Sequence, residues 1–74
     1  MQRIRGSVFA SDLETGGWGI EDNSGQTWRI VDMPSELQRA GLRLRAELDP
    51  IPEEASLFMW GRAARLRGYE LEKA

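Results

Sequence analysis

The 74-residue chain contains no cysteine and no histidine. The absence of cysteine excludes disulfide bonds and thiolate metal sites, and the absence of histidine removes the commonest general base and zinc ligand. No hydrophobic run approaches the roughly 18 residues of a membrane span, and the first residues lack the apolar core of a signal peptide. The sequence therefore predicts a cytoplasmic protein with no metal ion, no cofactor and no membrane segment.

Serine and threonine hydroxyls are present, but there is no histidine to activate them for covalent catalysis. We therefore expect a protein that is not an enzyme. Ten basic and twelve acidic residues give a formal charge of −2, which argues against tight, nonspecific binding to duplex phosphates. The acidic total still allows a local basic stripe on one face.

The sequence over residues 16–32 predicts a β-hairpin, and the interpretation of the other segments depends on it. Two short runs, each carrying a tryptophan and an isoleucine, flank the polar break at residues 23–25, Asn-Ser-Gly. Asn and Gly reach positive φ easily, so this break predicts a turn between two strands. Because side chains two residues apart share a face of a strand, Trp18 lies with Ile20, and Trp28 with Ile30.

Three further segments read as strands of the single predicted domain, residues 1–74. Residues 3–10 and 42–48 alternate between apolar and polar side chains, and residues 62–71 are the last strand candidate, with helix as an alternative for their first half. Gly6 suggests a bend or bulge in the first of them. A capping-box pattern at Ser35 and Gln38 predicts one or two helical turns ending near Gly41.

This order of elements predicts an all-β, five-stranded oligonucleotide-binding (OB) barrel, with a short helical turn between the third and fourth strands. The chain also resembles the cold-shock domain family over nearly its whole length. Residues 17–22, Gly-Trp-Gly-Ile-Glu-Asp, are similar to the family's first ribonucleoprotein motif, Lys-Gly-Phe-Gly-Phe-Ile followed by acidic residues. Residues 27–32 stand where the second motif, Asp-Val-Phe-Val-His, would lie. Residues 35–42 resemble the connector Ser-x-Leu-x-x-x-Gly-Leu, while residues 5–8 and 61–66 resemble the first and last strands.

The resemblance implies weak to moderate binding of single-stranded RNA or DNA. In that family, aromatic residues of the first sheet stack on bases while basic residues meet phosphates. The positions that correspond here are Arg5, Phe9, Trp18, Trp28 and Arg29.

Strand parity leaves two arrangements open for the hairpin. If Trp18 takes the ligand-facing position in a regular strand, Ile20 faces solvent and Glu21 faces the core, unless a bulge at Gly19 corrects the register. If Ile20 faces the core, Trp18 goes with it and the outer face of that strand carries only Gly17, Gly19 and Glu21. Trp28 is open to the same choice between core and stacking surface.

A second hypothesis is an OB-fold module for protein interaction or oligomerisation that has lost most of its nucleic-acid binding. It depends on the apolar run that contains Phe58, Met59 and Trp60. If exposed, such a patch would mark a site for a protein partner or a homodimer. If folded inward, it would be a lid over one end of the barrel.

Overall fold

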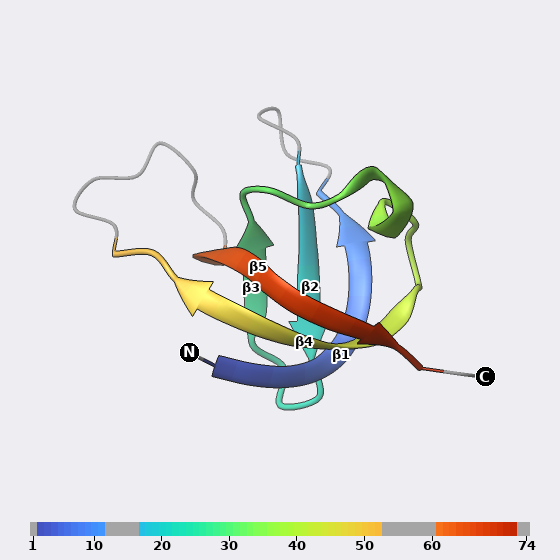
Figure 1. Ribbon diagram of the computed structural model, residues 1–74, viewed down its shortest axis with the longest axis horizontal. Coiled ribbons are helices and arrows are strands. Elements are labelled where there is room, and N and C mark those ends of the chain that lie inside the picture. Colours follow the sequence, from blue (N-terminus) through green and yellow to red (C-terminus); the bar gives the residue numbers. More distant parts are fainter. Residues whose placement is uncertain (1, 12–16, 53–60, 73–74) are drawn as a thin grey trace.

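A computed structural model describes residues 2–11, 17–52 and 61–72 of the chain. Within these ranges the backbone forms five strands and one turn of 3-10 helix (Figure 1). In chain order, they are β1 (Gln2–Ala10), β2 (Trp18–Asp22), β3 (Thr27–Ile30), η1 (Ser35–Leu37), β4 (Arg43–Pro50) and β5 (Arg62–Leu71). The predicted all-β class is confirmed, and β5 is a strand over its whole length, so the helical alternative for its first half is wrong.

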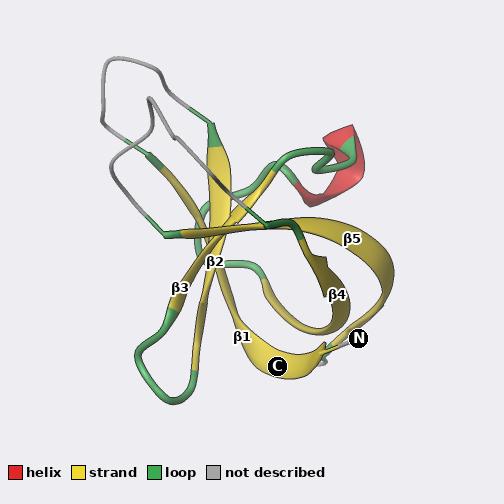
Figure 2. Cartoon of the chain, turned by 90° about the vertical axis from the view of Figure 1, so that its left-hand side faces the viewer, coloured by secondary structure: helices red, strands yellow, loops and turns green. Residues whose placement is uncertain are grey.

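The strands close into a barrel in the order β1-β2-β3-β5-β4, with β4 pairing back onto β1 (Figure 2). All neighbours are antiparallel except β3 and β5, which run parallel over three residue pairs. Closure pairs the strand edges that an open sheet would expose to other chains. The predicted five-stranded barrel, with its helical turn between β3 and β4, is therefore confirmed.

Alternation along the strands separates the core from the surface. On β1, Ile4 and Val8 point inward, while Arg5 and Phe9 lie on the outer face. On β4 the leucines and Ala46 are buried between outward charged residues, as predicted. The buried cluster consists of Ile4, Val8, Ile20, Trp28, Ile30, Met33, Leu37, Leu44, Ala46, Leu48 and Ala64.

The structure resolves the parity of the hairpin. Ile20 is fully buried and pairs with Val8 on one side and Trp28 on the other, so all three share the inner face. Trp28 is 2% exposed. Trp18 follows the same parity and packs, half-buried, against the core. Of the two arrangements, the regular strand with an inward Ile20 is therefore the one that forms.

The segment between β3 and β4 forms one helical turn, within the predicted one or two, but the turn ends at Leu37 and is capped differently than predicted. Only Ser35–Leu37 are helical, Pro34 is the residue before the turn, and no side-chain capping bond is formed. The predicted capping box is therefore wrong, because Gln38 donates its side-chain hydrogen bond to the Met33 carbonyl instead (3.1 Å). Leu37 is fully buried, so this turn still contributes to the core. Figure 2 shows the turn, in red, to one side of the strands.

Gly6 is required by a close approach of two strands rather than by a bulge. A Cβ atom at this position would lie 2.1 Å from the Glu21 carbonyl oxygen. The ladder with β2 begins at Gly6, and the ladder with β4 continues through it, both without a register shift. β1 is strongly curved (Figure 1), as the predicted bend requires. A register shift lies instead between Glu47 and Leu48, where β4 pairs with β5.

We predict that Gly6→Ala lowers the free energy of unfolding by about 1–3 kcal/mol, because the new methyl group meets backbone that cannot move aside. Gly68→Ala is the matched control, since a Cβ atom there meets nothing within 4 Å. It should change stability by less than about 1 kcal/mol, in the stabilising direction. Urea unfolding followed by tryptophan fluorescence measures both. Equal losses in the two variants would contradict the close approach of β1 and β2.

Candidate nucleic-acid interface

The outer face of β1, β2 and β3 carries one row with a stacking ring and a cation. The register pairs Phe9 with Gly19 and Gly19 with Arg29, so these three residues lie side by side across the strands. We call them the aromatic–arginine row. Phe9 and Arg29 are half-buried, and Gly19 is buried between them without a side chain. An aromatic ring can stack on a base, and a guanidinium group can stack on a base or bind a phosphate.

The next row toward the turn of the hairpin is polar and holds a negative charge. Ser7 pairs with Glu21, and Glu21 pairs with Thr27. Glu21 is exposed and lies on the same outer face as the aromatic–arginine row. A phosphate near this carboxylate would be repelled, so the row limits how strongly a polyanion can bind this face.

Two of the predicted stacking residues do not lie on this face. Trp28 belongs to the core, and its assignment as a binding residue is therefore wrong. Its ring is further covered by Arg62, whose guanidinium carbon lies 5.5 Å from the ring centroid. Trp18 is half-buried on the inner side of β2, so it does not join Phe9 on the outer sheet surface.

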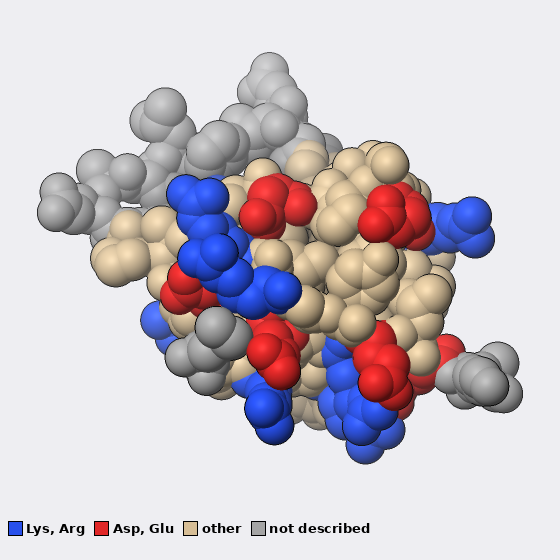
Figure 3. Space-filling model, viewed as in Figure 1, with Lys and Arg blue, Asp and Glu red and all other residues tan. Residues whose placement is uncertain are grey.

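The arginines of β1 lie on the outer face, as predicted, but are held in ion pairs. Arg5 donates a hydrogen bond to the Glu72 carboxylate at 2.6 Å, and Arg3 lies 3.5 Å from Glu47. Figure 3 shows basic and acidic side chains intermixed on the face it presents. The local electrostatic field is consequently mixed rather than strongly basic.

A carboxylate at the end of β2 anchors the hairpin that presents the row. Asp22 accepts hydrogen bonds from the Trp28 indole (3.0 Å), from the Ser24 amide and hydroxyl (2.9 and 2.5 Å) and from the Gln26 amide (3.0 Å). Burial raises the pKa of Asp22, but the bonds from Ser24, Trp28 and Gln26 outweigh it and hold that pKa below its usual value. Gly25 supplies the positive φ (92°) that the turn requires.

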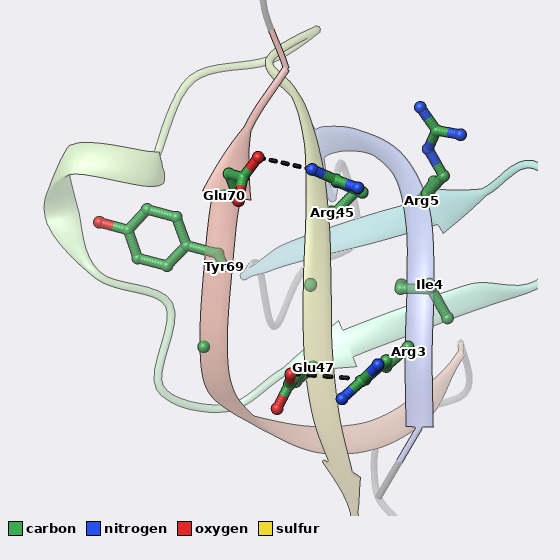
Figure 4. Close-up of a pocket in the computed structure, with 9 residues that line it drawn as sticks. Arg3, Ile4, Arg5, Arg45, Glu47, Tyr69 and Glu70 are labelled. Carbon is green, nitrogen blue, oxygen red and sulfur yellow. Dashed lines mark hydrogen bonds and ion pairs between the residues drawn. The ribbon is translucent and has the colours of Figure 1, made fainter.

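An open groove of about 650 Å³ crosses the outer face of β1, β4 and β5 (Figure 4). One wall is the row that contains Arg3 and Glu47, and the other contains Arg45 and Glu70. The alternation of residues 42–48 places Arg45 outward, but pattern alone does not show which strand lies beside it. This groove therefore could not be predicted from the alternation pattern alone.

The alternative partner patch, Phe58, Met59 and Trp60, lies outside the described residues, so it stays a prediction. Among the residues that the structure does describe, no group of three or more acidic side chains is placed to hold a metal ion. The described residues contain no helix that is long and apolar enough to cross a membrane. Comparison with known proteins found no matching family model, curated protein or solved structure.

We predict that Asp22→Asn lowers the free energy of unfolding at neutral pH by about 1–3 kcal/mol, because charge-assisted hydrogen bonds are lost. A carboxyl whose folded pKa is lowered stabilises the fold above its unfolded pKa of about 4. That contribution is lost as the pH falls through the lowered value. The gap between wild type and variant should therefore shrink in acid, as measured by urea unfolding across pH.

Asp32→Asn is the matched control for Asp22→Asn, because Asp32 accepts a single described hydrogen bond, from the Leu66 amide (2.9 Å). It should cost less than the Asp22 substitution at neutral pH. A gap between wild type and Asp22→Asn that does not change with pH would contradict the role of the Asp22 charge.

Proposed function

We propose that this barrel binds single-stranded nucleic acid on the outer face of β1, β2 and β3. The observation that carries the proposal is the aromatic–arginine row. A base that stacks on the Phe9 ring would lie over Gly19, which has no side chain to obstruct it, and would bring a neighbouring phosphate toward Arg29. This mode of binding depends on the aromatic faces of the bases and on the charge of the phosphate backbone, so it does not select a particular nucleotide sequence.

The same surface implies weak binding. Stacking on an aromatic side chain contributes about 1–3 kcal/mol per base, and the inward parity of β2 and β3 leaves Phe9 as the aromatic residue of the row. Glu21 opposes phosphates, and Arg5 is already paired with Glu72. Each phosphate neutralised on a single strand contributes a slope of about −0.7 to a plot of the logarithm of the binding constant against the logarithm of the salt concentration. The affinity of a protein with few cations on this face should therefore fall only slowly as salt is added.

We predict that Phe9→Leu and Arg29→Gln each weaken binding of a short, mixed-sequence DNA oligonucleotide by about fivefold or more, the range that stacking supports. Leucine keeps an apolar side chain on β1 but removes the ring. Fluorescence anisotropy of the labelled oligonucleotide at low salt measures the affinity, and circular dichroism verifies the fold of each variant.

Arg67→Gln is the control for charge, because it removes one cation from β5, where Arg67 pairs with Asp49 at 2.8 Å, away from the row. It should change the affinity by less than about twofold, as expected for an exposed charge. The proposal fails if folded wild-type protein does not bind at the highest usable concentration. It also fails if Arg67→Gln weakens binding as much as Arg29→Gln.

A further inference from the structure

Two arginines face each other directly across β1 and β4. Arg5 and Arg45 are register partners on the outer face, and Arg43 lies beside them, opposite Ser7. We call Arg5, Arg43 and Arg45 the arginine cluster. Like charges in directly opposed cross-strand positions repel each other, so this arrangement is favourable only when an anion lies among the guanidinium groups. The strand register therefore brings three guanidinium groups together in a site that favours binding of an anion.

In the structure two carboxylates meet this need: Glu70 pairs with Arg45 at 2.5 Å, and between Arg5 and Arg43 the anion is the carboxylate of Glu72. It lies 2.6 Å from Arg5 and 3.8 Å from Arg43, and its side chain is 19% exposed. The hydrogen bond from Arg5, together with the charges of Arg5, Arg43 and Arg45, lowers the pKa of Glu72 below its usual value. The acidic partners in the other described ion pairs are 44–70% exposed, so the cluster encloses Glu72 more fully than a typical surface pair.

The arginine cluster lies on the same outer face of β1 as the aromatic–arginine row. Phe9, Ser7 and Arg5 follow one another along that face, and Phe9 and Arg5 lie four positions apart, about 13 Å of extended strand. Arg43 also donates a hydrogen bond to the Asn23 side chain in the β2–β3 turn (3.4 Å), which places that turn beside the cluster. A nucleic-acid strand stacked on Phe9 can therefore continue over Ser7 to the arginines.

We propose that the arginine cluster is a phosphate-binding subsite and that Glu72 occupies it as an intramolecular competitor. The identity of the ligand, a phosphodiester of single-stranded nucleic acid, rests on the proposed function. Arginine binds carboxylate and phosphate oxygens with the same fork of donors, so one anion can replace the other without rebuilding the site.

Exchange of the two anions is physically reasonable because Glu72 is only lightly anchored. It follows the last residue of β5, and its backbone is held by one described hydrogen bond, from its amide to the Arg43 carbonyl (3.1 Å). Solvent still reaches these ion pairs through Arg5 and Arg43, whose side chains are 61% and 55% exposed, so the pairs contribute little net stability. The tether nevertheless keeps the carboxylate at a high effective concentration, so it competes with a dilute ligand.

Glu72→Gln tests the proposal, because it keeps the size and polarity of the side chain but removes the competing charge. It should raise the affinity for the mixed-sequence oligonucleotide by about two- to fivefold at low salt, the range set by an exposed ion pair. In an Arg5→Gln background this gain should disappear. Asp49→Asn is the control, since it makes the same change of net charge at the pair with Arg67.

The same variants are titrated with tripolyphosphate, which has no base to stack, and amide chemical shifts report binding. The subsite is supported if Glu72→Gln strengthens binding of either probe and if this gain is lost in the Arg5→Gln background. It is overturned if Glu72→Gln gives no gain, or if Asp49→Asn gives an equal one. Circular dichroism verifies the fold, and Glu72→Ala serves as a second variant if the first does not fold.

The two proposals fail in different ways. Oligonucleotide binding that depends on Phe9 but is unchanged by Glu72→Gln would overturn the subsite and leave the proposed function standing. If the oligonucleotide does not bind while Glu72→Gln binds tripolyphosphate through Arg5, the proposed function fails and the anion site stands. If neither probe binds any variant, both proposals are wrong.

Discussion

Burial of the Trp28 indole determines which face of the β2–β3 hairpin lies on the outside of the barrel. Trp28 is 2% exposed, and its ring packs in the core and donates its Nε1 hydrogen to Asp22 at 3.0 Å. Because strand side chains alternate, an inward Trp28 places Arg29 on the outside, and pairing with β2 then places Ile20 and Trp18 inside and Gly19 outside. The composition of the candidate binding surface follows from this one choice of face.

A barrel that uses Trp18 and Trp28 for the core has fewer aromatic side chains to offer a ligand. The resemblance to the cold-shock domain implied stacking on Trp18 and Trp28, and inward packing of both removes that contribution. In a chain of 74 residues, two large apolar side chains are a substantial part of the available core. Under the proposed function, stability and binding would compete for the same residues, which accounts for a candidate surface reduced to Phe9 and Arg29.

The alternation of apolar and polar side chains made the barrel predictable, because it shows which residues of a strand face the core whatever strands lie beside it. The inward leucines of β4 and the split between Ile4 and Arg5 on β1 follow directly from it. Features that depend on which strands are neighbours could not be predicted in this way. The contact of Glu72 with Arg5 joins residues 67 positions apart, and the need for glycine at position 6 comes from the backbone of β2.

The most direct test of this account is amide chemical-shift mapping of the wild-type protein with a short single-stranded oligonucleotide. We expect the largest shifts at Phe9, Gly19 and Arg29, with smaller ones toward Arg5, since all four lie on one outer face. A folded spectrum that does not change at saturating oligonucleotide, or shifts confined to exposed residues elsewhere such as Arg67 and its partner Asp49, would contradict this expectation.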